Sequence, residues 1–426
     1  MQRYDTYKDS GVKWLGEIPS HWEMRKMKFS FEERSQKGFP NLPLLAATQN
    51  HGVIRKTDYE NRTVEATKSL DTLKLVEIGD FVISLRSFQG GIELCYEKGI
   101  ISPAYTILRP THITAGYFKH LGKSPIFIQL LKSMVTGIRE GQNIDYGKLR
   151  ENLLPIPPIA EQTAIANYLD TATAKIDAAI AQQQKMIDLL NERKQIIINR
   201  AVTKGLNPNA KMKDSGVEWI EEVPEGWKVR RLKHVFRKIS DGTHFSPNTI
   251  SEGYPYITAT DVNGRGIDYD LVKRISAKDY DALVASGCKI EKGDILLVKD
   301  GATTGRVGMK TDEVSCVALS SVAMLTPSRK DDNNFLMYVM MSDILKKQID
   351  FSMAGAAMPR ITLVKLSNFI CTLPNHDEQV LISNYIESNI QPIENAIIAT
   401  NKIISLLQER KQIIINEVVT GKVKVV

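Results

Sequence analysis

Two stretches of the chain share one hydrophobic pattern, in which apolar residues recur at alternating steps of three and four. In the first stretch these positions are Ile165, Leu169, Ala172, Ile176, Ala179, Ile180, Met186, Ile187, Leu190 and Ile197. In the second they are Ile382, Ile386, Ile393, Ala396, Ile397, Ile403, Ile404, Leu407 and Ile414. Such spacing puts the apolar side chains on one face of an α-helix, as in a coiled coil. Each predicted helix needs a partner for this face, and the other copy is the obvious one.

The two helical stretches are copies of one sequence. Residues 189–203 (LLNERKQIIINRAVT) and 406–420 (LLQERKQIIINEVVT) agree at twelve of fifteen positions. Upstream, Glu161 and Gln162 recur as Glu378 and Gln379. The chain therefore contains a long internal repeat.

A second repeat precedes each half. Residues 9–28 (DSGVKWLGEIPSHWEMRKMK) return as residues 214–233 (DSGVEWIEEVPEGWKVRRLK), with ten of twenty identical, and the two copies hold all four tryptophans of the chain. We expect these tryptophans to pack each segment onto its domain, in preference to stacking on bases.

The sequences between the repeats differ, but both predict a mixed α/β (α+β) domain. The runs GDFVISL (79–85) and GDILLVK (293–299) read as strands, and helices are expected around 118–134 and 335–349. Pro392 interrupts the second helical pattern, so we expect a break there and, by symmetry, near 170–174. The first long helix would then cover 175–203, roughly 43 Å.

These patterns divide the chain into five segments. Two variable domains, 1–157 and 213–374, alternate with two helical segments, 158–203 and 375–426, and residues 204–212 form a linker with glycine and proline stop signals. Two similar halves that bury both apolar faces at once predict an antiparallel coiled coil with pseudo-two-fold symmetry. Two inverted domains on such a bar could approach the two strands of a DNA duplex equivalently.

Composition adds little that is specific. The net charge of +7 permits nucleic-acid binding without demonstrating it. No long apolar run or signal-peptide pattern is present, so we expect a cytoplasmic protein with no membrane partner. The four cysteines are isolated, which predicts buried thiols and neither disulfides nor a metal site.

The duplicated order of motifs resembles the specificity subunit of prokaryotic type I restriction-modification systems. The resemblance rests on the DSGVxW segments, on PPIAEQ (157–162) with its counterpart at Glu378 and Gln379, and on the ERKQIIIN helices. It implies two target recognition domains that read a bipartite, asymmetric DNA site. It also implies that the helices act as a spacer and bind two methyltransferase subunits, which restriction subunits join. The approach TLPNHDEQ (372–379) departs from the pattern by lacking the double proline.

The chain lacks the sequence motifs of an enzyme. No NPPY-like, GxGxxG, Walker A or HExxH motif is present, and DGATTGRVG (300–308) has no P-loop lysine. We therefore expect no catalysis and no cofactor in this chain, with S-adenosylmethionine, ATP and Mg²⁺ bound by partner subunits. Two alternatives stay open: an orphan DNA-binding protein without methyltransferase partners, and a nuclease using acids such as Asp294 and Asp300.

In the second domain, the loops SDGTHFSP (240–247) and KDGATTGR (299–306) combine glycine, small polar residues and cations. Such loops let backbone approach DNA and offer donors to bases or phosphates. The candidates are Thr243, His244, Lys299, Thr303 and Arg306. For Gly242 and Gly301, a tight turn that requires glycine is an equally good explanation.

In the first domain, SLRSFQGG (84–91) follows the corresponding strand, which makes Arg86, Ser87 and Gln89 the parallel candidates.

Another pair of loops, one in each domain, precedes the helices. The loop 139–148 supplies Arg139, Gln142 and Asn143, and the loop 354–362 supplies Arg360. Amide side chains suit adenine, whereas arginine suits guanine or phosphate. Ordinary surface polarity is the competing explanation for each.

A basic pair occurs twice beside the apolar stripe, as Arg193 with Lys194 and as Arg410 with Lys411. A solvated helix face would explain it. Because the same surface is duplicated, we instead expect these residues to contact the two methyltransferase subunits.

Overall fold

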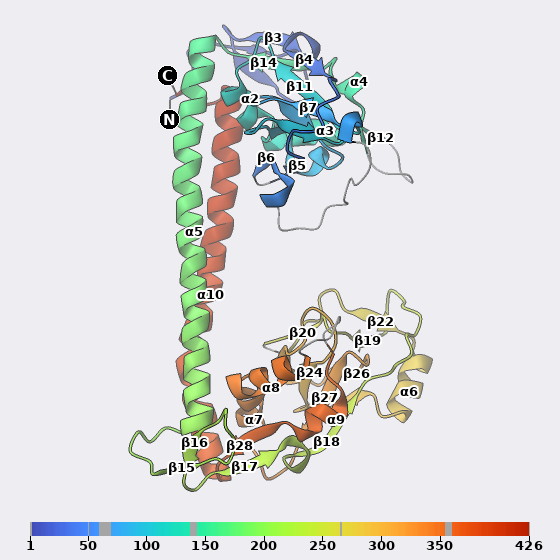
Figure 1. Ribbon diagram of the computed structural model, residues 1–426, viewed down its shortest axis with the longest axis vertical. Helices are drawn as coiled ribbons and strands as arrows, with labels where there is room; N and C mark the ends of the chain where they lie inside the picture. The colour runs from blue at the N-terminus through green and yellow to red at the C-terminus, as the bar shows by residue number, and fades with distance from the viewer. Residues whose placement is uncertain are drawn as a thin grey trace. The chain divides into compact units, whose positions relative to one another are not determined.

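The computed structural model describes residues 2–49, 51–58, 70–136, 143–264, 266–353 and 360–425 (Figure 1). The chain forms two compact units. Unit 1 combines Met1–Gln184 with Asn401–Val426, and unit 2 is Lys185–Thr400. The five-segment division expected above is untested by this grouping and stays a prediction.

Two long helices dominate the chain: α5 (Ile159–Lys204) and α10 (His376–Val419). Both are continuous, so the breaks expected near 170–174 and at Pro392 are wrong. A proline inside a helix removes the hydrogen bond to the carbonyl four residues earlier, here that of Ser388. Both Ser388 and Pro392 are exposed, so water can satisfy this carbonyl and α10 continues.

Each unit pairs a segment of α5 with a segment of α10. In unit 1, Ile165 and Leu169 share a core with Ile414 and Val418. In unit 2, Ile198 and Val202 share a core with Ile382, Ile386 and Ile390. The predicted stripe is buried at the two ends of the helices and mostly half-buried between them.

Two residues assigned to the stripe point away from it. Met186 and Ile403 are 50% and 45% exposed, whereas Ile187, directly after Met186, is buried. Where two apolar residues are adjacent in the sequence, the spacing alone does not decide which of them faces inward.

Unit 1 holds a four-stranded sheet in the order β4-β11-β8-β9, with antiparallel neighbours. Phe31, Phe81, Phe118 and Phe127 pack edge to face in its core. The strands are β1 (Tyr7–Asp9), β2 (Glu17–Pro19), β3 (Glu23–Lys26), β4 (Phe31–Arg34), β5 (Leu45–Thr48), β6 (Gly52–Arg55), β7 (Lys74–Val76), β8 (Phe81–Ile83), β9 (Glu93–Leu94), β10 (Gly99–Ile101), β11 (Thr106–Pro110), β12 (Val135–Thr136), β13 (Asn143–Ile144) and β14 (Leu153–Ile156). The short helices are α1 (Ser87–Gly90), α2 (Ala115–Leu121), α3 (Pro125–Ser133) and α4 (Tyr146–Leu149).

Unit 2 repeats the order as β18-β27-β24-β25 and adds the sheet β22-β19-β26-β23, in which β19 and β26 are parallel. The strands are β15 (Met212–Asp214), β16 (Glu222–Pro224), β17 (Lys228–Arg231), β18 (Phe236–Asp241), β19 (Tyr254–Ile257), β20 (Val262–Asn263), β21 (Gly266–Ile267), β22 (Lys273–Ile275), β23 (Lys289–Ile290), β24 (Ile295–Val298), β25 (Val307–Met309), β26 (Cys316–Ala318), β27 (Val322–Pro327) and β28 (Ile370–Leu373). The short helices are α6 (Ala277–Ala285), α7 (Asn333–Met340), α8 (Asp343–Met353) and α9 (Leu363–Asn368). The expected mixture of helix and sheet is confirmed.

The strands predicted at 79–85 and 293–299 are present as β8 and β24. The helices predicted around 118–134 and 335–349 are each replaced by two helices, α2 with α3 and α7 with α8. In the first domain the cause is local, because Ser124 caps α3 through the N–H of Phe127 and Pro125 occupies its first turn.

The repeated tryptophan segment is held by the first turn of each long helix. The indole N–H of Trp22 donates to Glu161 at 3.1 Å, and that of Trp227 donates to Glu378 at 3.0 Å. Both indoles are buried, but Trp219 is 47% exposed. The packing expected of all four tryptophans is thus wrong for Trp219.

The adjacent glutamine joins each helix to its domain through backbone groups. Gln162 Oε1 accepts from the N–H of Thr114 at 2.8 Å, and its Nε2 donates to the carbonyl of Pro157. Gln379 does the same with the N–H of Asp332, at 2.8 Å, and the carbonyl of Pro374. We call each Glu–Gln pair, Glu161–Gln162 and Glu378–Gln379, a joint.

Replacing Gln379 with leucine should lower the free energy of unfolding of unit 2 by about 1–3 kcal/mol, because a buried N–H and a carbonyl lose their partners. Urea unfolding followed by tryptophan fluorescence measures this, since Trp227 lies at the joint. Gln391→Leu, an exposed position on the same helix, is the matched control. Equal effects of the two substitutions would contradict the structural role of the joint.

Candidate nucleic-acid interface

In unit 2, three segments far apart in the sequence meet at one cluster of charges. Asp241 Oδ2 lies 3.3 Å from Lys299 Nζ and 3.6 Å from His244 Nε2. Lys299 Nζ lies 3.1 Å from Asp300 Oδ2, and Asp300 Oδ1 lies 3.3 Å from Arg360 Nε. The structure therefore brings together both predicted loops and Arg360. We call Asp241, Lys299, Asp300 and Arg360 the charge ladder.

Two of the predicted contact residues face inward. The side chain of Lys299 is 3% exposed and neutralises two carboxylates. Thr243 is buried as well, and its hydroxyl accepts from the N–H of Phe245 at 3.0 Å. Both side chains are therefore directed inward and help to shape the loops, and their direct contact with DNA stays a prediction.

Other candidates of this domain reach solvent. Arg360 is 63% and His244 67% exposed at the side chain, and Arg306 is also exposed, with its Nη1 donating to the carbonyl of Val262 at 3.3 Å. Thr303 is half-buried. Phe245, which the sequence analysis missed, is 69% exposed on the same loop as His244.

The two glycines of these loops are needed for different reasons. A Cβ atom on Gly242 would lie 1.9 Å from the carbonyl oxygen of Ala318, so the loop packs directly against β26. Gly301 has φ +94°, a conformation that favours glycine. The tight-turn explanation is thus supported for Gly301, whereas Gly242 is explained by close packing of the backbone.

In the first domain, the predicted loop after β8 is the short helix α1. Ser87 is 2% exposed and its hydroxyl accepts from the N–H of Ser84, so its side chain is part of the turn. A contact of Ser87 with DNA stays a prediction. Arg86 and Gln89 are exposed. Gln49, missed by the sequence analysis, donates from Nε2 to Gln89 Oε1 at 3.5 Å.

Three candidates cannot be placed. Arg139 and Gln142 lie outside the described residues. Asn143 belongs to β13, which pairs with β12, but its side chain is not described. All three stay predictions.

The acids considered for a nuclease hold turns together. Asp294 accepts from the N–H of Glu291 at 2.9 Å, and Asp80 of the first domain accepts from the N–H of Glu77 at the same distance. Asp300 belongs to the charge ladder. Within the described ranges, no group of three or more His, Cys, Asp or Glu residues is arranged to hold a metal ion.

Each basic pair on the helices contains one lysine in an ion pair and one exposed arginine. Lys194 forms an ion pair with Glu394 inside unit 2, and Lys411 Nζ lies 2.7 Å from both carboxylate oxygens of Asp177 inside unit 1. These lysines thus join α5 to α10. Arg193 and Arg410 are exposed.

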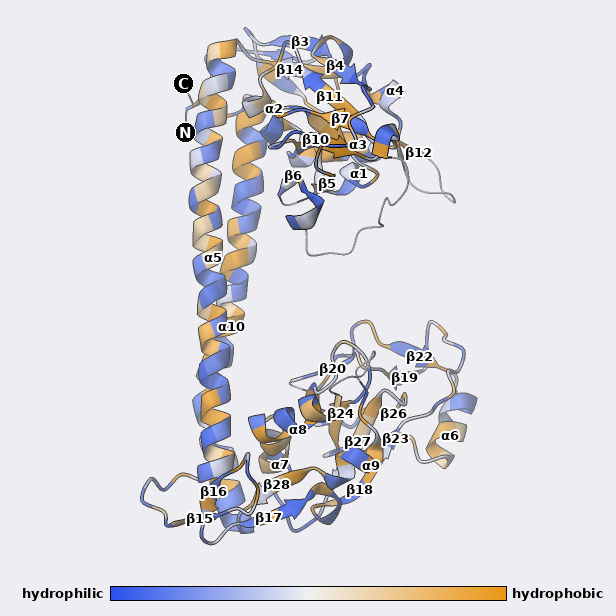
Figure 2. Ribbon diagram, viewed as in Figure 1, coloured by the Kyte–Doolittle hydropathy of each residue, from blue (hydrophilic) through white to orange (hydrophobic). Residues whose placement is uncertain are grey.

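Each exposed arginine stands among apolar side chains that are also exposed. Met186, Leu189 and Ile196 surround Arg193 and are 50%, 50% and 57% exposed. Ile403, Leu406 and Ile413 surround Arg410 and are 45%, 54% and 48% exposed. Steps of three and four place each set on one helix face, and hydrophobic residues recur along both helices (Figure 2). We call these sets the outer faces.

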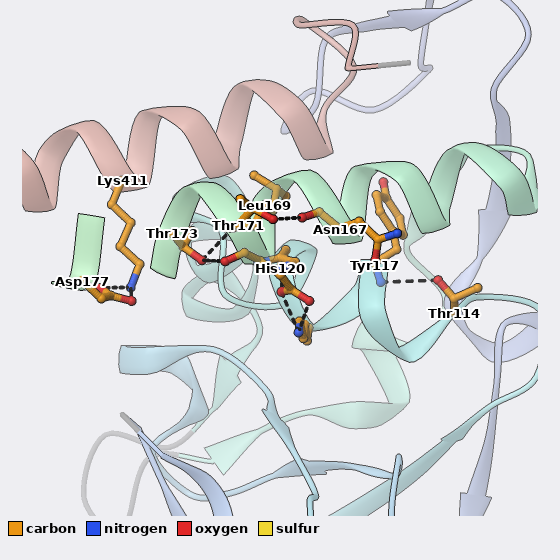
Figure 3. A network of polar contacts seen from close by, with 11 residues as sticks. Thr114, Tyr117, His120, Asn167, Leu169, Thr171, Thr173, Asp177 and Lys411 are labelled. Carbon is orange, nitrogen blue, oxygen red and sulfur yellow. Dashed lines mark hydrogen bonds and ion pairs between the residues drawn. The ribbon is translucent and has the colours of Figure 1, made fainter. Parts of the chain in front are cut away.

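A polar network ties the first domain to α5 (Figure 3). His120 Nε2 lies 2.7 Å and Lys119 Nζ 2.9 Å from the carboxylate of Asp170. Burial lowers the pKa of His120, although the bond to Asp170 acts in the opposite direction. Burial of Asp170 opposes its ionisation, but the hydrogen bonds from Lys119 and His120 outweigh this and lower its pKa. Asp170 is thus a charged anchor for α2.

Known proteins resemble this chain in sequence and in fold. Residues 224–403 match the family model described as type I restriction modification DNA specificity domain. The MjaVIII specificity subunit of Methanocaldococcus jannaschii is 28% identical over 70% of this chain and 69% of its own length. A putative MjaX specificity subunit of the same organism is 24% identical over 98% of each chain.

By these matches the chain resembles the specificity subunits of type I restriction enzymes. A solved structure concerned with assembly and conformational transition of a type I R-M system has the same fold, with a TM-score of 0.64 at 15% identity, over 95% of this chain and 99% of that one. No helix in the described part of this chain is long and apolar enough to cross a membrane.

One buried carboxyl group of the first domain should make stability depend on pH. Burial raises the pKa of Glu93 to about 7, although Lys123 Nζ, 2.7 Å from Oε2, favours the charged form. Ionisation of Glu93 therefore costs stability as pH rises from about 4.5 to 7.

At pH 8, Glu93→Gln should raise the free energy of unfolding by up to about 3 kcal/mol relative to wild type and so raise the melting temperature. At pH 4.5 it should change both little. Thermal unfolding across this range measures the difference. Glu32→Gln, an exposed position, serves as control. A difference independent of pH would refute the shifted pKa.

Proposed function

We propose that this protein is the DNA sequence-specificity subunit of a type I restriction-modification complex. Its two domains would read the two unlike halves of a bipartite, asymmetric DNA site. The observation that carries the proposal is that both domains share one strand order and one joint, while the loops on this common scaffold differ. A constant scaffold with unlike loops suits the reading of two unlike sequences.

The proposed architecture is an antiparallel coiled coil with a pseudo-two-fold internal repeat. Its support is an exchange of contacts: Lys194 of α5 pairs with Glu394 of α10, and the repeat-related Lys411 of α10 pairs with Asp177 of α5. A contact that recurs with the two partners exchanged is typical of two-fold symmetry.

The chain would supply no catalysis of its own. Methyltransferase subunits would bind S-adenosylmethionine, and restriction subunits would bind ATP and Mg²⁺. We place the complex in the cytoplasm, where it would act on double-stranded DNA.

Deleting the gene in its source genome should abolish adenine methylation at one split, asymmetric motif, because no other chain would direct the methyltransferase there. Long-read sequencing with the gene intact and deleted measures this and yields both half-sites. An unchanged pattern with the gene expressed would instead favour an orphan DNA-binding protein.

We further propose that the two outer faces bind the two methyltransferase subunits. Each face combines three half-exposed apolar side chains with one exposed arginine. Interfaces favour apolar residues and arginine at their centre. Two like faces on one chain suit two copies of one partner.

The double change Leu189→Asp and Leu406→Asp should abolish co-purification with the methyltransferase while the chain stays folded, because both positions are exposed. Arg193→Glu with Arg410→Glu should weaken it. As a control, Ser388→Asp, also exposed on α10, should leave co-purification intact. Retained binding by the aspartate variant would exclude the outer faces as the docking sites.

A further inference from the structure

We infer that Arg360 reads a guanine base and that Asp300 is the positioning residue that orients it. The inference rests on the proposed DNA-specificity function. It chooses guanine as the partner of Arg360. It also gives Asp300 a role in orienting Arg360, which the sequence did not indicate.

The main chain fixes the place of Arg360. Arg360 forms an antiparallel β-bridge with Asp300, and the N–H of the next residue, Ile361, donates to the carbonyl of Lys299 at 2.8 Å. Arg360 and Ile361 are thereby held against the loop that follows β24. A side chain on such a fixed backbone has fewer positions to sample.

The carboxylate of Asp300 forms an ion pair with the side chain. Asp300 Oδ1 lies 3.3 Å from Arg360 Nε without hydrogen-bond geometry, while its Oδ2 accepts from Lys299. The carboxylate thus lies on the Nε side of the guanidinium, and the four N–H groups of the two terminal nitrogens form an end-on pair of donors on a side chain that is 63% exposed. Such a pair matches O6 and N7 of guanine.

Charge balance favours a base over a phosphate. The charge ladder holds two carboxylates and two cations, so its net charge is zero. A phosphate next to Arg360 would lie close to Asp300 and be repelled by it, whereas phosphate contacts depend on net positive charge. The neutral edge of a base meets no such penalty.

Lys299 explains why Asp300 can be charged at a half-buried position. The buried Lys299 ammonium lies between Asp241 and Asp300 and compensates both. Lys299 therefore acts two steps away from DNA, through Asp300 and Arg360. Under this inference, an indirect contact takes the place of the predicted direct one.

The test compares methylation motifs in a host without other adenine methyltransferases. The host expresses the full-length chain with its methyltransferase partner, as wild type, Arg360→Ala, Arg360→Lys or Asp300→Asn, with Arg86→Ala in the other domain as control. The Arg360 variants should relax one G·C position in one half-site, with discrimination there falling on the order of tenfold. Asp300→Asn should relax the same position in part, and Arg86→Ala should leave it intact.

Binding to duplexes of the mapped motif gives a second readout. Substituting 7-deazaguanine removes the N7 acceptor, and at one guanine this should weaken wild-type binding but not that of Arg360→Ala. A uniform loss over all positions, or equal sensitivity of both proteins to every substitution, would overturn the inference while the proposed function stands. Absence of any motif with the wild-type chain would overturn the proposed function itself.

If Asp300→Asn fails to fold, Arg360→Lys still decides. It keeps the charge at an exposed position but lacks the paired donors. A motif unchanged by Arg360→Lys and by Arg360→Ala would refute the assignment of guanine.

Discussion

Each long helix buries apolar side chains against the other long helix and against the domains. The segment of α5 in unit 1 packs against the last turns of α10, and the segment of α10 in unit 2 packs against the last turns of α5. Unit 1 is therefore built from two separate pieces of chain, whereas unit 2 is one continuous piece. Both depend on contacts between residues 200 or more positions apart, Asp177 with Lys411 in unit 1 and Lys194 with Glu394 in unit 2. The joints attach each domain to one of the paired helices, so the position of the domain's loops depends on the helix pair.

Much of this organisation follows from local sequence. The duplicated helices, the strands after each GD turn, the four buried cysteines and the mixed fold were predictable, because periodicity and turn residues act over a few positions. The continuity of α10 through Pro392 was not, because it depends on the exposure of one carbonyl. Which lysines and arginines face inward was also beyond local pattern.

The charge ladder illustrates the limit of sequence for the candidate site. Lys299, Arg360 and the loop at Thr243 and His244 could be selected by residue type alone. Their roles depend on Asp241, which lies 58 positions before Lys299, and on a β-bridge that brings Arg360 to Asp300. Tertiary contacts of this kind distinguish candidates of the same residue type. They bury Lys299 between two carboxylates and leave Arg360 exposed.

The joints have an evolutionary consequence. From the domain side, both glutamines bind peptide groups, the N–H of Thr114 or Asp332 and the carbonyl of Pro157 or Pro374. Gln379 also binds one side chain, the carboxylate of Asp331, which accepts from it at 3.0 Å. A main-chain N–H is present at any residue except proline, and a main-chain carbonyl at every residue. Mutations can therefore accumulate in the loops of both domains while the attachment persists. Under the proposed function, a lineage could then acquire new target sequences by drift or by exchange of whole domains, with its helices unchanged.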